Sequence, residues 1–270
     1  MRLYALQCCS TADPEENLAR LRRQLAPLAA QPGDKLVVLP ECVLAFDGPK
    51  GQWQALAEPL DEGPMQAQMA ELAQLAGCTL VAGTLPILAE DGRAYASSLV
   101  FDSRGRRVGR YDKLHLFDVT VGDNTGHYRE SDTTHPGQQI EVIETSLGRV
   151  GLAVCYDLRF PELFREMTAR GAQILVLPSA FTRVTGEAHW EALLKARAIE
   201  NQVYLVAAGQ VGVHANGRQT WGHSMILDPW GEQLADAGEQ EGMIDAPFDR
   251  ERIQEVRQAM PCLNHIRLPL

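Results

Sequence analysis

The segment GRVGLAVCYDLRFPELFREMTARGAQILVLPSA, residues 148–180, decides the fold class of this chain. It begins with an apolar run that ends in Cys-Tyr-Asp, continues through a helix-like stretch at residues 160–169, and closes with an apolar run that ends in Pro-Ser. Both runs are too continuous for strands with one face in water, so we expect central strands covered on both faces. This strand–helix–strand order predicts a layered α/β domain.

The same alternation extends outward in both directions. Further strands are predicted by LYALQCC, KLVVLPE, TLVAGTLP, AYASSLVFD, RRVGRYDK, QIEVIETS, NQVYLVAAG, WGHSMILDP, GEQLADAG and EGMIDAPF. Further helices are predicted at residues 14–30, 64–76, 189–200 and 249–259. Without a Gly/Ser linker, low-complexity stretch or short repeat, residues 1–270 are expected to form one domain.

Composition and charge exclude several classes of function. The 270 residues are 45% hydrophobic and 22% charged, as in an ordinary globular enzyme. The net charge of −10 makes nucleic acid and anionic membranes poor partners. No apolar run approaches the length of a membrane span, and MRLYALQCCS does not read as a signal peptide. The cysteines are scattered without a CxxC pair, so we expect free thiols in a reducing cytoplasm.

Three reactive residues occupy equivalent places in the predicted strands. Glu41 ends LVVLPE, Lys113 ends RRVGRYDK, and Cys155 ends RVGLAVC. Singly, such a cysteine is usually a small buried hydrophobe, and such a lysine or glutamate is usually solvated or ion-paired. Together they indicate one pocket, because ligands gather at the carboxyl ends of strands in open α/β sheets.

The three residue types form a chemically sensible set. A thiol with an ordinary pKa of about 8.5 is mostly protonated at neutral pH, so a carboxylate that accepts its proton promotes attack. A nearby ammonium supports the thiolate and the oxyanion that forms on the substrate carbonyl. The backbone N–H of Tyr156, at a sharp turn just after Cys155, is a second candidate donor to that oxyanion.

The stretches LVVLPE, GRYDKLHLFD, YRESDTTHPG and GLAVCYDLRFPEL resemble the four signature segments of the nitrilase-type carbon–nitrogen hydrolases. The resemblance continues through LPSAFTRVTGEAHWEALLKARAIENQVYLVAAGQ and WGHSMILDPWGE, and so covers nearly the whole chain. It implies a four-layer αββα sandwich, no cofactor or metal, and a homo-oligomer, a dimer or larger, paired through helices. Relatives generally carry a longer basic and aromatic tail after the segment that matches MPCLNHIR.

The resemblance also implies the roles of the site residues. Glu41 is the general base and acid, Lys113 stabilises the oxyanion, and Cys155 is the nucleophile. It adds Glu130, within YRES, which orients Lys113 and the substrate amide. From the residues alone Glu130 would be interpreted as a solvated acid in the irregular loop over residues 114–138.

Other residues near the predicted nucleophile leave alternatives open. Arg159 follows Cys155 by four residues, and either binds a substrate carboxylate or forms a structural ion pair with Asp157 or Glu162. His115 is a candidate partner in a cysteine–histidine dyad, although no CGxCW motif surrounds Cys155.

The remaining candidates are interpreted as structural. Cys42 is expected to face away from Glu41 on a strand and lie in the core. His214 and His223 lack the clustered carboxylates or second cysteine that would complete a metal site. Trp190 and Trp221 are expected in the core or an interface. No phosphate loop or dinucleotide fingerprint occurs, so we expect no cofactor.

The stretch AAGQVGVHANGRQTWGHSM resembles the family branch that hydrolyses deaminated glutathione more than the ω-amidase branch. The similarity lies in the Gln after AAG and in the Gly-x-His-x3-Arg pattern. It implies an amidase that releases 2-oxoglutarate and cysteinylglycine. The alternatives are an ω-amidase acting on 2-oxoglutaramate or 2-oxosuccinamate, and a catalytically silent binding or regulatory subunit.

Overall fold

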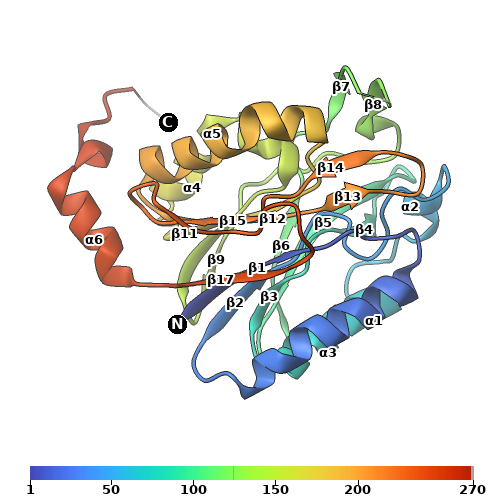
Figure 1. Ribbon diagram of the computed structural model, residues 1–270, viewed down its shortest axis with the longest axis horizontal. Helices are drawn as coiled ribbons and strands as arrows, with labels where there is room; N and C mark the ends of the chain where they lie inside the picture. Colours follow the sequence, from blue (N-terminus) through green and yellow to red (C-terminus); the bar gives the residue numbers. More distant parts are fainter. Residues whose placement is uncertain (124, 269–270) are drawn as a thin grey trace.

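The computed structural model describes residues 1–123 and 125–268, and contains two facing β-sheets covered by helices on their outer faces (Figure 1). The first sheet has the order β17-β1-β2-β3-β5-β4, with β6 paired to β5, and the second has the order β16-β15-β12-β11-β10-β9. Strands β1 and β2 contact β12 of the second sheet. Helices α1 and α3 cover one sheet and α4 and α5 the other, which is the predicted αββα arrangement.

The strands of the first sheet are β1 (Arg2–Gln7), β2 (Lys35–Val38), β3 (Thr79–Val81), β4 (Leu85–Leu88), β5 (Ala94–Phe101), β6 (Arg107–Asp112) and β17 (Gly242–Pro247). Those of the second are β9 (Val142–Thr145), β10 (Gly148–Leu152), β11 (Ile174–Ser179), β12 (Tyr204–Gly209), β15 (Met225–Leu227) and β16 (Gln233–Asp236). The helices are α1 (Pro14–Leu25), α2 (Gln52–Ala55), α3 (Pro64–Ala76), α4 (Pro161–Ala169), α5 (Arg183–Asn201) and α6 (Arg250–Ala259).

The continuous apolar runs arise because both faces of the central strands are buried. In β1, Leu3 and Ala5 lie in the core between the two sheets. The alternate residues Tyr4 and Leu6 lie in a second core, beneath α1 and α3. Successive strand side chains point to opposite faces, so a strand that contributes to both cores is apolar at every position.

The ends of the helices follow from local residue chemistry, but the sequence pattern placed the beginning of α5 too late. Asp13 caps α1 by accepting hydrogen bonds from the first-turn N–H groups, and Pro14 begins the helix. Helix α5 begins at Arg183, six residues before the predicted start at residue 189. Its first turns contain Gly186, and a Cβ there would lie 2.2 Å from the Trp221 ring. A glycine required for close packing therefore made this helix look like a loop.

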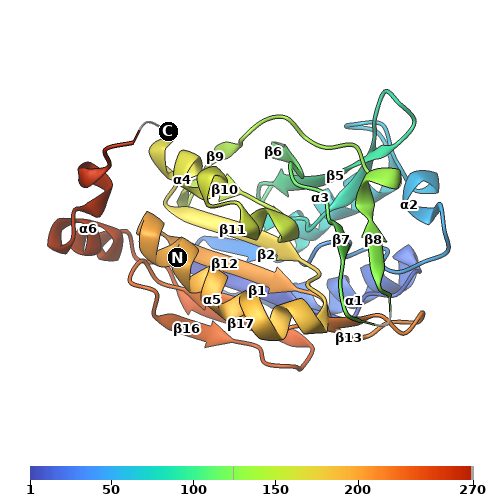
Figure 2. The same ribbon diagram turned by 90° about the horizontal axis from the view of Figure 1, so that it is seen from above.

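Two short hairpins border the same end of the sandwich (Figure 2). Strands β7 (Asp118–Thr120) and β8 (His127–Arg129) lie within the predicted loop 114–138, of which residue 124 lies outside the described residues. Strands β13 (Val211–Val213) and β14 (Gln219–Trp221) form the second hairpin. Each of these four strands has only three residues, too few for a reliable alternation signal.

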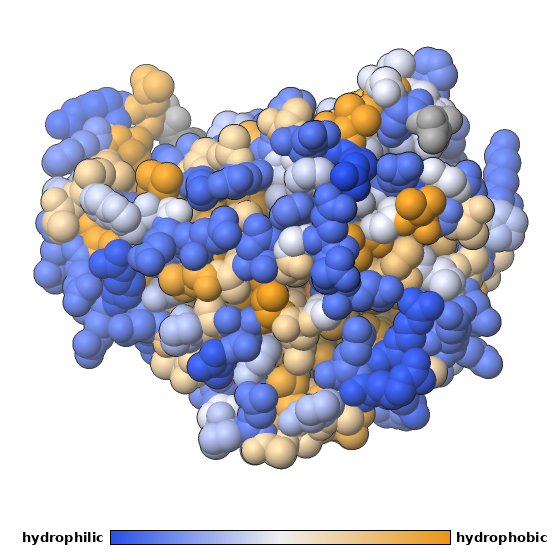
Figure 3. All heavy atoms as spheres, in the orientation of Figure 1, coloured by the Kyte–Doolittle hydropathy of each residue, from blue (hydrophilic) through white to orange (hydrophobic). Residues whose placement is uncertain are grey.

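Hydrophilic side chains cover most of the face seen in Figure 1, with apolar spots between them (Figure 3). Within the described part of the chain, no helix combines the length and apolarity needed to cross a bilayer. Trp190 is buried in the core, as expected, and Trp221 is partly buried against α5.

Candidate active site

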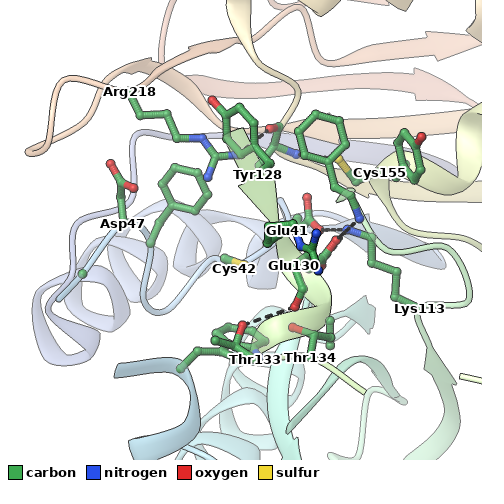
Figure 4. A pocket seen from close by; sticks show the side chains of 18 of the residues that line it. Glu41, Cys42, Asp47, Lys113, Tyr128, Glu130, Thr133, Thr134, Cys155 and Arg218 are labelled. Carbon is green, nitrogen blue, oxygen red and sulfur yellow. Dashed lines mark hydrogen bonds and ion pairs between the residues drawn. The ribbon is translucent and has the colours of Figure 1, made fainter. Parts of the chain in front are cut away.

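The buried residues Glu41 and Lys113 meet the partly buried Glu130 in one cluster (Figure 4). Glu41 lies in the turn after β2, and Lys113 directly follows β6. Lys113 Nζ donates to Glu41 Oε1 at 2.8 Å and to both Glu130 carboxylate oxygens at 2.9 Å. The exposed fractions of Glu41 and Lys113 are only 5% and 2%. Glu41 and Glu130, which lie 72 and 17 positions from Lys113 in the sequence, thus share its ammonium group.

Glu130 is held in place although it lies in a loop. It begins the 3-10 helix η2 (Glu130–Asp132), which follows β8. The Phe117 N–H donates to Glu130 Oε2 at 2.6 Å, in addition to the two bonds from Lys113. A loop carboxylate with three hydrogen bonds has a defined position, unlike a solvated surface acid.

Cys155 occupies a strained turn at the end of a strand. It is the first residue of the 3-10 helix η3 (Cys155–Arg159), which follows β10, and its φ angle is 47°. A left-handed conformation is costly for a residue with a side chain and recurs at functional turns. The Ala180 N–H, just after β11, approaches the Cys155 Sγ atom at 3.5 Å. The turn presents the thiol beside the carboxylate–ammonium cluster, as the strand-end pattern predicted.

The electrostatics of the cluster favour a protonated thiol beside a charged lysine. Burial and the charge of Glu41 raise the pKa of Cys155 well above its ordinary value, and Lys113 opposes this only in part. Burial alone would lower the pKa of Lys113, but Glu130 and Glu41 raise it well above normal. Burial also raises the pKa of Glu130, against the attraction of Lys113. The cluster therefore combines two acidic side chains, a charged lysine and a protonated thiol on one wall of the pocket.

Asp157 connects the lysine segment to the cysteine turn. Its fully buried carboxylate accepts hydrogen bonds from the Val154 N–H at 2.8 Å and from the Tyr111 hydroxyl at 2.7 Å. It also lies 2.7 Å from His115 Nδ1. The sequence interpretation considered Asp157 only as a partner for Arg159 and missed this role.

The structure contradicts the alternative of a Cys155–His115 dyad. The His115 ring is paired to Asp157 and stacks on Phe160, with ring centroids 3.6 Å apart. His115 is also not among the residues that line the pocket at Cys155. His115 therefore has a structural role: through Asp157 it connects the segment after Lys113 to the turn that contains Cys155.

A cavity of about 550 Å³ opens beside the cluster, large enough for a small organic substrate. Its walls contain the aromatic residues Phe46, Trp53, Phe117, Tyr128, Tyr156 and Phe181. Cationic side chains come from Lys50, Lys113, Arg129, Arg159 and Arg218. Acidic side chains come from Glu41, Asp47 and Glu130, and the first and last of these contact Lys113. The remaining cations make the pocket suitable for a partly apolar substrate that carries negative charge.

Tyr156 and Arg159 both line this pocket, and their predicted role in substrate binding stays a prediction. The Arg159 guanidinium lies 5.2 Å from the Phe181 ring centroid and 5.8 Å from that of Tyr156. Its Nη1 atom lies 3.2 Å from His189 Nδ1. Within the described residues it forms no ion pair, and the predicted alternative of a pair with Asp157 or Glu162 is wrong.

Two pocket residues differ from the sequence interpretation. Cys42 lines the cavity instead of lying in the core, because β2 ends at Val38 and strand alternation no longer applies at Cys42, where φ is 53°. Arg218, in the turn between β13 and β14, also lines the cavity and was given no role. The Gly-x-His-x3-Arg pattern contains Arg218 and was the available signal.

The histidines near this turn are engaged in hydrogen bonds. His214 contacts the Ser10 carbonyl at 3.2 Å and the Thr220 hydroxyl at 2.8 Å. His223 pairs with Asp236 at 3.2 Å. Across residues 1–123 and 125–268, no group of three or more histidine, cysteine or acidic side chains has the geometry of a metal site.

This fold and arrangement agree with comparisons to known proteins. The chain belongs to the carbon–nitrogen hydrolase family, whose sequence profile matches residues 2–258. The predicted family, its α/β sandwich and its class of hydrolase are therefore confirmed.

Individual relatives cover nearly the whole chain. The chain is 42% identical to the deaminated glutathione amidase of Yersinia enterocolitica, over 97% of this chain and 91% of that protein. It is 37% identical to the omega-amidase NIT2 of Xenopus tropicalis, over 96% and 92%. The crystal structure of Saccharomyces cerevisiae Nit3, a member of branch 10 of the nitrilase superfamily, matches with a TM-score of 0.85 and 34% identity, over 97% and 94%.

Proposed function

We propose that the chain is an amidase that hydrolyses deaminated glutathione to 2-oxoglutarate and cysteinylglycine through an acyl thioester on Cys155, a metabolite-repair reaction. The observation that carries the proposal is the buried contact of the Lys113 ammonium with the carboxylates of Glu41 and Glu130, next to the thiol. In this proposal Glu41 is the base, Lys113 the oxyanion-stabilising cation and Cys155 the nucleophile, around one point of the pocket.

In the first half-reaction, Cys155 Sγ attacks the amide carbonyl carbon while its proton passes to Glu41. The resting thiol is protonated, so attack needs a base at that moment. When the tetrahedral intermediate collapses, the C–N bond breaks and Glu41 returns the proton to the leaving nitrogen. The amine departs, and the acyl group remains on the sulfur as a thioester.

In the second half-reaction, water attacks the thioester carbonyl and gives a proton to Glu41. Collapse of the new tetrahedral intermediate breaks the C–S bond, and the departing sulfur takes that proton back. The carboxylic acid leaves, and Cys155 and Glu41 return to their starting states. Glu41 thus acts as base and acid in both halves.

The negative oxygen in each tetrahedral intermediate needs donors that are already in position. Lys113 is one, and the Tyr156 N–H, in the first turn of η3, is the proposed second. Loss of one such donor typically costs about 10²–10³ in rate. Glu130 holds Lys113 and orients the substrate amide through its two carboxylate oxygens.

Two observations support deaminated glutathione as the substrate. Arg159 offers a guanidinium without an ion-pair partner among the described residues, which suits the carboxylate of a 2-oxo acid. The Yersinia relative also carries this activity in its name. The second candidate is an ω-amidase acting on 2-oxoglutaramate or 2-oxosuccinamate, which the Xenopus relative supports.

The test compares deaminated glutathione with 2-oxoglutaramate by release of 2-oxoglutarate through one coupling enzyme. We expect kcat/KM to favour deaminated glutathione by at least about tenfold, because its larger leaving group adds binding energy in the transition state. A ratio in the opposite direction would assign the chain as an ω-amidase. A catalytically silent subunit would release product from neither and would show no unusually reactive cysteine in thiol labelling.

We make four further proposals of this kind. Residues 1–270 form one domain, the protein works in the cytoplasm, and copies of the chain pair into a dimer or larger oligomer. The exposed Val184 and Ile199 on α5, with Trp230 also exposed, support pairing through helices. The reaction needs no cofactor or metal, because the protein groups and water supply every proton and nucleophile.

A further inference from the structure

Arg218 places a guanidinium in the pocket at the end away from Lys113 (Figure 4). Its Cζ atom lies 4.7 Å from the ring centroid of Phe46 and 5.1 Å from that of Tyr128. Phe46 comes from the loop after β2, Tyr128 from β8, and Arg218 from the β13–β14 turn. Aromatic rings from two other segments thus hold the cation in a defined position.

The Arg218 guanidinium has hydrogen-bonding capacity that the protein does not use. Its Nη2 atom approaches the Ala180 carbonyl at 3.5 Å, and its buried Nε atom has no hydrogen-bond partner among the described residues. Within the same residues it forms no ion pair. Two carboxylates lie near this end of the pocket: Asp47 lines it, and the charge of Arg218 lowers the pKa of Asp123. Neither makes an ion-pair contact with the Arg218 guanidinium among the described residues. The guanidinium is always charged and partly buried, so it still favours a ligand that supplies an anion in direct contact.

A dipeptide leaving group is long enough to reach from the nucleophile to Arg218. The N–H of Ala180 approaches Cys155 Sγ at 3.5 Å, while the carbonyl of the same residue contacts Arg218. The N and O atoms of one residue are roughly 3 Å apart, so the guanidinium lies within roughly 10 Å of the sulfur. Two extended residues span at most about 7 Å, and a hydrogen bond adds about 3 Å.

We infer that Arg218 forms an anion subsite that binds the terminal carboxylate of a peptide-like leaving group. The inference rests on the proposed amidase function. It identifies the terminal carboxylate as the reason why deaminated glutathione is preferred to 2-oxoglutaramate. Arg159 neighbours the nucleophile on η3 and serves the acyl half, whereas Arg218 serves the half that departs. Arg129 is a weaker candidate, because its side chain is 70% exposed and lies 3.9 Å from Asp132. Ammonia, the leaving group of 2-oxoglutaramate, cannot use the Arg218 subsite.

The experiment uses deaminated glutathione and the same compound with its terminal carboxylate converted to a glycinamide. Both give the same acyl enzyme, so their ratio of kcat/KM reports on the leaving-group carboxylate alone. We expect Arg218→Gln to reduce this ratio at least about tenfold, since hydrogen bonds between charged groups are strong. The matched control is Arg183→Gln, because Arg183 lies outside this pocket and is paired with Glu239 at 3.1 Å. The control should keep the ratio within about twofold of the wild type.

The outcomes separate the inference from the proposed function. An unchanged ratio in Arg218→Gln, with wild-type cleavage of deaminated glutathione intact, overturns the subsite alone. Wild-type activity on 2-oxoglutaramate without cleavage of either longer amide overturns the proposed substrate and the subsite together.

A second measurement does not depend on the variant folding. Cysteinylglycine should inhibit the wild-type protein at least about tenfold more strongly than cysteinylglycinamide, since only the former carries the carboxylate. Equal inhibition constants for the two dipeptides would contradict the subsite.

Discussion

Replacing Lys113 with methionine removes the cation that serves Glu41, Glu130 and the oxyanion of the reaction. Glu41 and Glu130 both contact its Nζ atom, so their nearest oxygens lie within about 6 Å of each other. At an effective dielectric constant of about 20, two unpaired negative charges at that distance repel by about 3 kcal/mol. The oxyanion also loses its charged donor, which costs a further factor of about 10²–10³ in rate. We therefore expect kcat/KM to fall by about 10³ or more.

The same substitution should make stability depend on pH. Burial already raises the pKa of Glu130, and loss of the lysine charge raises it further. A carboxyl group with a higher pKa in the folded than in the unfolded chain lowers stability as the pH rises from the unfolded value through the folded one. Lys113→Met should therefore be more destabilised at pH 8 than at pH 5.

The assays are 2-oxoglutarate release and urea unfolding of wild type and Lys113→Met at both pH values. The double variant Lys113→Met with Glu130→Gln is the matched control, because it removes the repulsion without restoring the ammonium. It should recover part of the stability at pH 8 and none of the turnover. Activity of Lys113→Met within about tenfold of wild type would refute the assignment of Lys113 as oxyanion donor.

Three further predictions test other groups in the site. Glu41→Gln should lower turnover by about 10²–10⁴ but speed the alkylation of Cys155 by iodoacetamide at pH 8, because Glu41 is, after burial, the main cause of the raised pKa of the Cys155 thiol. If turnover and alkylation both slowed, Glu41 would instead be supporting a resting thiolate. Arg159→Gln should lower kcat/KM by about 10- to 100-fold for both deaminated glutathione and 2-oxoglutaramate. The control Arg170→Gln, which removes a surface ion pair with Glu166, should leave kcat/KM unchanged. A loss for only one of the two substrates would show that Arg159 does not bind the 2-oxo acid that they share. Activity should survive dialysis against EDTA, and its loss with recovery on adding zinc would contradict a reaction that uses protein groups alone.

The residues at strand ends predicted the chemistry of the site well, whereas the boundaries of the helices and strands were predicted less well. Glu41 and Cys155 each follow a strand with a buried apolar run, whereas Lys113 follows β6, whose sequence RVGRYD is polar and partly exposed. Their convergence could be inferred from the sequence because ligands gather at the carboxyl ends of strands. The early part of α5 could not, because Gly186 is there to accommodate Trp221, a contact that periodicity does not record.

The loop residues depended on the family resemblance or were missed. Glu130 contacts Lys113 only because β7 and β8 return the chain to the cluster, and the hydrophobic pattern carries no information on that path. The same holds for Asp157, whose partners Tyr111 and His115 come from a distant segment. Arg218 lies in the turn of a hairpin whose strands have only three residues each, so hydrophobic periodicity could not place it in the pocket, and the Gly-x-His-x3-Arg pattern was the only signal.

The central claim is that Cys155 carries the acyl group, and rapid-quench mass spectrometry of the protein during turnover tests it most directly. Deaminated glutathione and 2-oxoglutaramate should give the same adduct, one 2-oxoglutaryl group, and proteolysis should place it on the peptide that contains Cys155. Cys155→Ser should fold, form no thioester and lose nearly all turnover, because a hydroxyl is a much poorer nucleophile than a thiol. An adduct on another residue, or substantial turnover by Cys155→Ser, would contradict the claim.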